Sequence, residues 1–312
     1  MSAASLIIDL TYRCNARCSY CRWGDGRTGE RSDLPVGELC ISAAILAAAG
    51  IGRVVLSGGE PMLHPALATV LAHYTAEGVA ERIVITNGLL ATRPRVAALH
   101  AAGATGFAFS VDSVDPEVAG AARATTAAQL ASVLAHLSSA GEYAARHGLE
   151  LGVNCVLSAA NCDLAGVRRL VASAWERGAT SLKFQPTFDD GYLGTNAPHL
   201  RLGPEHADVI LDIGRDAASW PITTNGSAFF ADLAATCSGV RLHSRACGLG
   251  GRTFVLQSGG LVVCPWIGAP PARGPAPALA AFEEGRKACA TGPHCFCLQP
   301  RGQVWAPSDA VR

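Results

Sequence analysis

Short apolar runs alternate with longer stretches of helical period along the chain as far as Pro186. Apolar side chains at helical spacing predict five helices, over roughly 35–49, 65–77, 93–102, 125–147 and 163–177. Pro94 suits a first helical turn, and Asp163 suits the cap before a helix. The apolar runs predict six strands, at 6–11, 53–57, 82–86, 105–111, 149–157 and 181–186. This alternation of strand and helix predicts parallel β/α units.

Six such units fall short of the eight of a closed (β/α)8 barrel. We therefore expect an α/β fold, a partial (β/α)6 TIM-like barrel, whose active site lies at the C-terminal ends of the strands. After Pro186 come a loop over 187–201, one more helix near 204–219, and a Gly- and Cys-rich segment with little helical period. We divide the chain near residue 235, into a partial barrel with a linking helix (1–235) and a small Cys-rich domain (236–312).

Composition and charge narrow the class of protein. Of 312 residues, 49% are hydrophobic and 16% are charged, which excludes a disordered chain. The 25 Lys and Arg balance the 25 Asp and Glu, so no basic surface for nucleic acid or an anionic membrane is indicated. We find no signal peptide at the N-terminus, and the longest weakly polar stretch, near 40–51, is too short for a membrane span. We expect a cytoplasmic protein with neither nucleic-acid nor membrane partners.

The chain has 12 cysteines, and they are clustered. In a cytosolic protein, cysteines indicate metal binding or catalysis before disulfides. One group lies within 14–21 and a second within 237–297. Cys40, Cys155 and Cys162 lie between the two groups, and we interpret them as buried small residues.

The first group, Cys14, Cys18 and Cys21, directly follows the first predicted strand, so all three thiols share one loop at the mouth of the barrel. Three thiolates on a four-iron cluster would leave one iron open to a further ligand. The alternatives are a zinc site or buried thiols, although CxxxCxxC is not the usual paired spacing of structural zinc sites.

Further motifs follow in order at the ends of the next three strands. They are Gly58-Gly59-Glu60-Pro61, then Thr86-Asn87-Gly88, then Ser110-Val111-Asp112-Ser113. Together with the cysteine triplet, they resemble the radical S-adenosylmethionine (SAM) superfamily over about residues 6–186. No single motif is specific, but their order and their positions at strand ends agree.

The resemblance implies two cofactors, a [4Fe–4S] cluster on the CxxxCxxC triplet and SAM. In this family the GGE motif receives the amino group of SAM, and groups at the end of the fourth strand bind its ribose or carboxylate. Tyr20, just before Cys21, matches the aromatic position beside the adenine. Such enzymes take one electron from a low-potential donor, cleave SAM to a 5′-deoxyadenosyl radical and abstract hydrogen from an unactivated C–H bond.

The second cysteine group resembles the opening of the SPASM/twitch auxiliary-cluster domains of this superfamily. Cys247, Gly259 and Cys264 have the spacing of that motif. Three more cysteines follow: Cys289, Cys295 and Cys297. This short series fits the twitch form with one auxiliary [4Fe–4S] cluster, and a zinc ribbon is the alternative. Either Cys247 is a ligand, or Cys264 and the last three supply all four ligands and Cys247 is a free thiol. Cys237 could substitute in either scheme.

Twitch and SPASM enzymes act on peptides or on carbohydrates and aminocyclitols. We see no peptide-recognition extension before the first strand, which favours a small-molecule substrate. Asp189 and Asp190 directly follow the sixth strand and could receive a polycationic aminosugar, although a solvated loop beside Gly191 is the simpler interpretation.

The chain is similar to the twitch enzymes of aminoglycoside biosynthesis, notably those of the neomycin C epimerase type. This resemblance implies an epimerase, an isomerase of antibiotic biosynthesis, that acts on a carbinol or aminomethyl-bearing carbon of an aminoglycoside. Cys247 would return a hydrogen atom from its thiol. The alternatives are a twitch-type dehydrogenase of an aminosugar or aminocyclitol alcohol, a peptide-modifying enzyme, and an iron–sulfur protein that does not cleave SAM.

Overall fold

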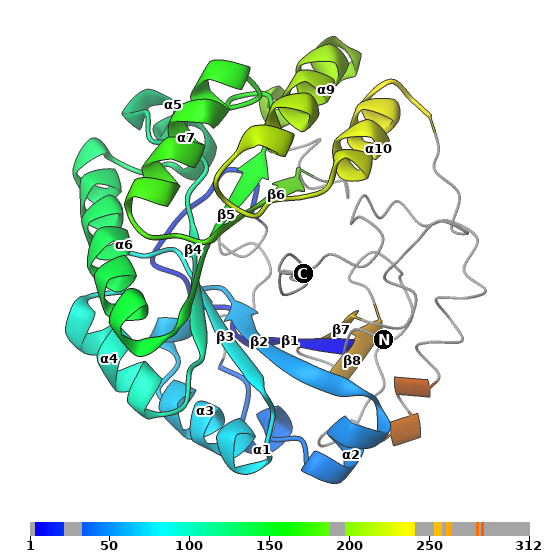
Figure 1. Ribbon diagram of the computed structural model, residues 1–312. Coiled ribbons are helices and arrows are strands. Elements are labelled where there is room, and N and C mark those ends of the chain that lie inside the picture. Colours follow the sequence, from blue (N-terminus) through cyan, green and yellow to red (C-terminus); the bar gives the residue numbers. More distant parts are fainter. Residues whose placement is uncertain are drawn as a thin grey trace.

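The computed structural model describes residues 4–21, 33–187, 197–240, 253–257, 260–263, 279–280 and 282–283. These residues form one eight-stranded sheet in the order β6-β5-β4-β3-β2-β1-β7-β8. Neighbouring strands from β6 to β7 are parallel, and β8 is antiparallel to β7. The sheet curves around a central lumen, and helices cover its outer side (Figure 1). This arrangement is the expected α/β partial barrel.

All six expected strands are confirmed, and their ends differ from the expected ones by at most two residues. The bounds are β1 Ala4–Thr11, β2 Ile51–Gly58, β3 Glu81–Thr86, β4 Gly106–Ser110, β5 Glu150–Leu157 and β6 Ser181–Pro186. Strands buried on both faces have nearly continuous apolar sequences, and this made them readable from sequence.

The helices largely follow the expected periods. Within the described residues they are α1 Val36–Leu39, α2 Ala43–Ala48, α3 Leu67–Ala76, α4 Arg93–Ala101, α5 Pro116–Arg123, α6 Ala127–His147, α7 Leu164–Glu176, α9 Ala207–Asp216 and α10 Ser227–Cys237. Short 3-10 turns occur at Pro61–Leu63, Pro198–Leu200, Pro204–His206 and Ala217–Ser219. The expected helix over 35–49 is divided because Cys40 has an extended backbone. Pro94 does lie in the first turn of α4, and Asp163 does cap α7 by accepting a 2.6 Å hydrogen bond from the Gly166 N–H.

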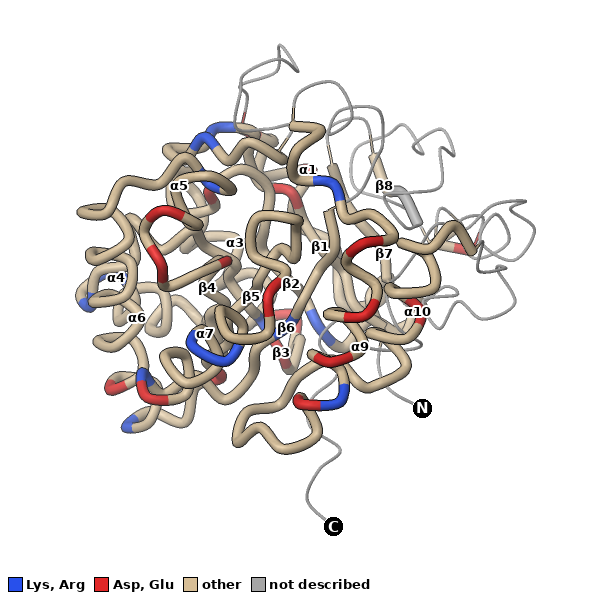
Figure 2. Tube along the Cα trace, turned by 90° about the horizontal axis from the view of Figure 1, so that it is seen from above, with Lys and Arg blue, Asp and Glu red and all other residues tan. Residues whose placement is uncertain are grey.

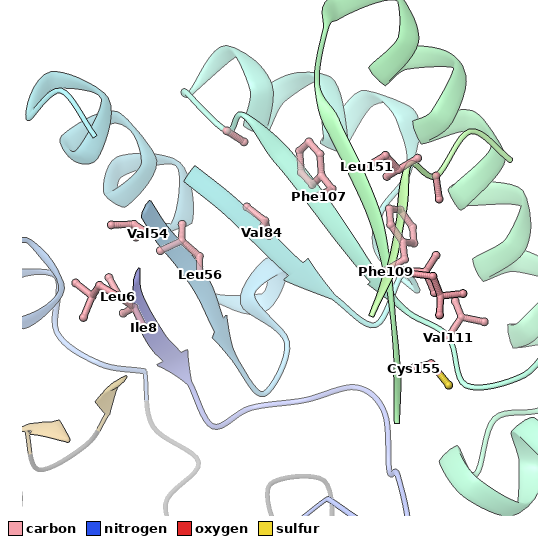
Figure 3. Packing of buried hydrophobic residues seen from close by; sticks show 14 of the residues in the cluster. Leu6, Ile8, Val54, Leu56, Val84, Phe107, Phe109, Val111, Leu151 and Cys155 are labelled. Carbon is pink, nitrogen blue, oxygen red and sulfur yellow. The ribbon is translucent and has the colours of Figure 1, made fainter. Parts of the chain in front are cut away.

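Alternate residues of each strand pack on opposite sides of the sheet. Leu6 and Ile8 of β1, with Val54 and Leu56 of β2, belong to the large core on the helix-covered side (Figure 3). A separate apolar cluster lines the inward face and consists of Val55, Ile83 and Ala108, with Ile7 and Ile85 packed against it. The residues that alternate with the outer core therefore face the lumen.

Charged side chains lie below this apolar cluster, toward the amino ends of the strands. Arg53 is 3% exposed, forms an ion pair with Glu81, and lies 3.8 Å from Glu150. Lys183 of β6 donates a 3.0 Å hydrogen bond to the Thr224 carbonyl, and burial lowers its pKa to about 8. These charges are partnered within the protein, so the opposite, carboxyl end of the lumen is the place to look for a ligand site.

The strands β7 Thr253–Gln257 and β8 Gly260–Val263 lie in the segment assigned to the second domain. β7 pairs parallel with β1, with Leu6 opposite Phe254, so the barrel sheet continues into that segment. Sequence reasoning missed both strands, because it interpreted this Gly- and Cys-rich segment as a cluster-binding domain and the partner strand β1 is far away in the sequence. The boundary near residue 235 stays a prediction, and the expected auxiliary-cluster cysteines lie outside the described residues.

Acidic and basic positions are interspersed around the outer helices of the described part (Figure 2). This distribution agrees with the balanced charge count of the sequence. Among the described residues, no helix combines the length and the apolar character that crossing a membrane requires.

Candidate functional site

The cysteine triplet lies in the loop after β1, as expected. Cys18 is 8% exposed, and Cys14 and Cys21 are half-buried. The Cys21 N–H donates to the Cys18 carbonyl at 3.0 Å, which closes a tight turn. The Cys14 sulfur accepts hydrogen bonds from the Ala16 N–H at 3.4 Å and from the Asn87 side-chain amide at 3.7 Å. Burial raises the pKa of both Cys14 and Cys18, so these thiols stay protonated until a metal displaces the proton.

The three thiols of the loop are the donor type that an iron–sulfur cluster takes. Across the described residues, no three His, Cys, Asp or Glu side chains converge as the ligands of one ion would. In a [4Fe–4S] cluster each thiolate binds a different iron, so convergence on one point is not required. Hydrogen bonds to the sulfurs also tune such clusters, and the two donors to Cys14 have this character.

Gly58 and Gly59 bring the end of β2 against the cysteine loop. The Gly59 N–H donates to the Thr11 carbonyl at 2.6 Å, and the Glu60 N–H donates to the Arg13 carbonyl at 2.8 Å. A Cβ atom on Gly59 would overlap the Arg13 carbonyl oxygen, and Gly58 has a φ of +114°. Only glycine permits this close approach, which fixes the cysteine loop against the GGE motif.

Glu60 joins the ends of β2 and β3. Its side chain is fully buried and accepts three hydrogen bonds, from the Asn87 N–H at 2.8 Å, the Thr86 hydroxyl at 2.9 Å and the Met62 N–H at 3.1 Å. Burial raises the pKa of Glu60, while these three hydrogen bonds act in the opposite direction. Pro61 then begins the 3-10 turn at Pro61–Leu63. The role expected for Glu60, receiving the amino group of SAM, stays a prediction.

Tyr20, Asp112 and Arg123 form a hydrogen-bonded group, in which Asp112 is fully buried, that links the cysteine loop to the end of β4. The Tyr20 hydroxyl donates to Asp112 at 2.6 Å and accepts from Arg123 at 2.8 Å. Asp112 also forms an ion pair with Arg123 at 3.4 Å and accepts from the Val156 N–H at 2.9 Å. Desolvation raises the pKa of Tyr20 well above its ordinary value, so the hydroxyl stays protonated. Asp112 therefore positions Tyr20 and Arg123.

Sequence reasoning missed Arg123. It ends α5, a short helix that was itself not expected, and a lone arginine in an Ala-rich stretch has no distinguishing pattern. The available signal was its place between two motifs, shortly after Asp112 and before a capping Thr126.

The predicted residues at the ends of β3 and β4 border one pocket. Asn87, Ser110, Asp112 and Arg123 contribute polar groups to its lining. Leu130 and Val133 of α6 are among its apolar lining residues. The pocket therefore lies at the carboxyl ends of the parallel strands, where ligands bind in such folds.

Several predicted residues lie outside the described residues. They are Asp189, Asp190, Cys247, Cys264, Cys289, Cys295 and Cys297. Cys155 and Cys162 are buried, as expected, with exposed fractions of 1% and 9%. Cys40 is half-buried instead, because it lies at the break between α1 and α2.

Comparisons with known proteins agree with this geometry. Residues 8–145 match the family model of the Radical SAM superfamily. This segment, less than half of the chain, contains the cysteine triplet, Glu60, Asn87 and Asp112.

Among curated relatives, the PqqA peptide cyclase of Xanthomonas euvesicatoria pv. vesicatoria is 31% identical over 191 residues, which are 60% of this chain and 48% of that protein. The GTP 3′,8-cyclase of Chlorobaculum tepidum is 36% identical over 111 residues, which are 35% of this chain and 33% of that protein. The chain thus spans half or less of the length of these relatives.

Two solved structures share the fold. Streptococcus suis SuiB bound to S-adenosylmethionine has a TM-score of 0.63 at 14% identity, over 92% of this chain and 65% of that chain. The structure of anSMEcpe with bound AdoMet and Cp18Cys peptide has a TM-score of 0.62 at 16% identity, over 92% of this chain and 80% of that chain. At these identities the likeness shows the partial-barrel fold alone.

Proposed function

We propose that the protein is a radical SAM enzyme with a [4Fe–4S] cluster on Cys14, Cys18 and Cys21 and SAM in the adjoining pocket. The reduced cluster, when bound, supplies the electron that cleaves SAM and releases the 5′-deoxyadenosyl radical. One observation carries this proposal: Asn87 connects the GGE carboxylate to the cluster loop. Its backbone N–H donates to Glu60 at 2.8 Å, and its side chain donates to Asn15 at 2.7 Å and to the Cys14 sulfur at 3.7 Å.

Different protein groups near the pocket suit different parts of a SAM molecule. Arg123 is 11% exposed and keeps its positive charge beside the pocket, where it suits a carboxylate ligand. Ser110 offers a hydroxyl from the end of β4. Tyr20 is not among the residues that line the pocket, but its hydroxyl is held by Asp112 and Arg123, which are. The α6 side chains Leu130 and Val133 contribute apolar surface to the pocket. Exclusion of water from a site of this kind protects a carbon radical from side reactions.

Cluster binding is tested by anaerobic reconstitution of the wild type and of Cys14→Ala, Cys18→Ala and Cys21→Ala. We expect each variant to lose the electron paramagnetic resonance signal of its reduced SAM-binding cluster and to form no 5′-deoxyadenosine from SAM. Cys40→Ala is the matched control, since Cys40 is half-buried and lies on a different element. Formation of 5′-deoxyadenosine at the wild-type rate by any of the three variants would overturn the proposal.

For the substrate, a peptide has the better support. The similarity to a PqqA peptide cyclase covers 191 residues, more than the 138 residues from 8 to 145 that match the superfamily model. We therefore place a peptide modification first, as a change from the sequence-based order of candidates.

The aminoglycoside epimerase, with Cys247 as the hydrogen donor and one auxiliary cluster in a twitch domain, is the second candidate. It draws on the sequence resemblance and on cysteines outside the described residues, and the cyclase relatives named above do not support it. A twitch-type alcohol dehydrogenase is ranked equally with the epimerase, as a second candidate function.

An assay in D₂O separates these candidates. The reconstituted enzyme, SAM and a reductant are offered aminoglycosides and peptides, and the products are analysed by mass spectrometry. An aminoglycoside isomer with one solvent-derived deuterium would establish the epimerase. An aminoglycoside lighter by two hydrogens would establish the dehydrogenase. We expect instead an altered peptide, with aminoglycosides unchanged.

A further inference from the structure

The lumen of the barrel has a second polar layer, directly above its apolar cluster. On β1, Ile7 belongs to that cluster and Asp9 is the next residue on the same face. On β2, Ser57 follows Val55 in the same way and pairs in register with Asp9. We call Asp9, Ser57, Ser110 and Asn154 the upper lumen layer.

Asn154 places β5 in this layer. Its neighbours Val153 and Cys155 belong to the outer core, so the Asn154 side chain faces the lumen. It pairs in register with Ser110, which lines the candidate SAM pocket. The upper lumen layer thus adjoins that pocket, and Figure 1 shows β1 and β5 on facing parts of the curved sheet.

Asn154 is 7% exposed, and its Oδ1 atom has no hydrogen-bond partner among the described residues. A buried amide oxygen without a donor is costly, and few native groups remain in this state. An acceptor that is aimed into a lumen beside a cofactor pocket is explained when a ligand supplies the donor.

Asp9 is a second acceptor in this layer that lacks a donor among the described residues. Its carboxylate is half-buried, and no group among the described residues donates a hydrogen bond to it. The nearest charged layer in the lumen consists of Arg53, Glu81, Glu150 and Lys183, which partner one another or the backbone lower in the barrel. Desolvation raises the pKa of Asp9 to about 7, so the carboxyl gains when a donor or a cation reaches it.

We propose that the upper lumen layer is a substrate subsite in which Asp9 and Asn154 accept hydrogen bonds from an amine or a hydroxyl group of the substrate. Both groups are acceptors; Asn154 pairs in register with Ser110 of the pocket proposed for SAM, and Asp9 lies in the same layer of the lumen. The subsite therefore holds a donor-bearing carbon near the position from which hydrogen is taken. This inference rests on the proposed function, since the subsite has this meaning only beside bound SAM.

Two sources supply such a group, a lysine-type side chain of a peptide and an aminocyclitol. The probes are accordingly lysinamide and 2-deoxystreptamine. Each is titrated by anaerobic calorimetry into the cluster-loaded wild-type protein with SAM bound. We expect one of them to bind, and the probe that binds identifies the source.

Variants then locate the binding. Asp9→Asn keeps the size of the side chain and removes its charge, and Asn154→Ala removes the unpartnered oxygen. Each is expected to weaken the binding of the probe by about tenfold, the typical effect of losing one hydrogen bond to a charged group. Asp163→Asn is the control, since Asp163 caps α7 on the outer side of the barrel. The affinity of this variant for the probe should equal that of the wild type.

Circular dichroism and iron content verify that each variant is folded and loaded. Absence of binding by both probes to the wild type, or equal affinity in the wild type and both lumen variants, would overturn the subsite. The formation of 5′-deoxyadenosine by the wild type is measured separately. If it is absent, the proposed function itself fails, and this outcome is distinct from failure of the subsite alone.

Discussion

Single polar residues fix the shape of the site through partners that are distant in sequence. Asp112 shows this most clearly, because its carboxylate holds Tyr20 of the cysteine loop and Arg123 of α5. Its side chain is fully buried. A sequence reveals the residue types but not these pairings, so it predicted a role for Asp112 in SAM binding, which stays a prediction, and not the contacts with Tyr20 and Arg123.

Asp112→Asn tests the importance of this group for stability. The variant keeps the size of the side chain but leaves Arg123 buried without its counter-charge. We expect the free energy of unfolding to fall by about 3 kcal/mol, as when one partner of a buried ion pair is removed. Urea denaturation measures it. Arg93→Ala breaks an exposed pair with Glu142 and should have a much smaller effect; equal effects would refute this account.

Gly59→Ala tests the contact between the GGE motif and the cysteine loop. The new methyl group would overlap the Arg13 carbonyl oxygen, so the loop must move. We expect the reconstituted variant to bind less iron and to form 5′-deoxyadenosine at least tenfold more slowly than the wild type, as about 1.4 kcal/mol of lost positioning would cause. Gly37→Ala, where the methyl group meets open space, is the control and should match the wild type.

At the scale of helices and strands, sequence patterns predicted most of the barrel. β1 to β6 were readable because most of them are nearly continuous apolar runs, and α6 was readable because it is 21 residues long and begins with a capping box at Thr126. α5 was missed because it has only eight residues and follows a strand closely. β7 was missed because its partner β1 is nearly 250 residues away, and pairing at such a distance leaves no local signal.

The close contact between Gly141 and Arg177 requires a residue without a side chain at position 141. In α6, a Cβ atom on Gly141 would overlap the Arg177 carbonyl oxygen, just before β6. Gly141→Ala is therefore expected to lower the free energy of unfolding by about 1–3 kcal/mol, the usual cost of overpacking. Gly120→Ala in α5, whose nearest atom is the Thr125 carbonyl oxygen at 3.5 Å, should be neutral or stabilising. Thermal denaturation of both variants measures their stability relative to the wild type. An equal loss of stability in the two variants would contradict the argument.

Across the whole barrel, the lumen is layered: partnered charges at the amino end, apolar side chains above them, and the upper lumen layer next to the pocket proposed for SAM. The apolar cluster isolates Asp9 from the charges below. Periodicity alone placed Asp9 on a strand and gave no indication of this isolation, because the layers arise from the register of several strands.

The isolation of Asp9 predicts a pH dependence of folding. Its pKa is about 7 in the folded chain against an ordinary value of 3.8, so the folded state holds a proton that the unfolded state has released between these values. Stability therefore decreases as the pH rises through this window and levels off above it. Asp9→Asn should remove this contribution. The stability of the variant relative to the wild type is expected to increase from pH 4 to pH 7, and a constant difference in urea denaturation would contradict it.

β1 lies inside the sheet, between β2 and β7, and this position affects how the chain folds while it is being synthesised. One side of β1 pairs with β2, which follows within about fifty residues. The other side pairs with β7, which is synthesised much later, at 253–257. During translation, the strand that leads into the cluster loop is thus an open sheet edge until almost the last part of the barrel has emerged from the ribosome. Such an edge is able to pair with other chains. The barrel around the cysteine loop therefore closes late in synthesis, and until then this edge of β1 has no partner strand.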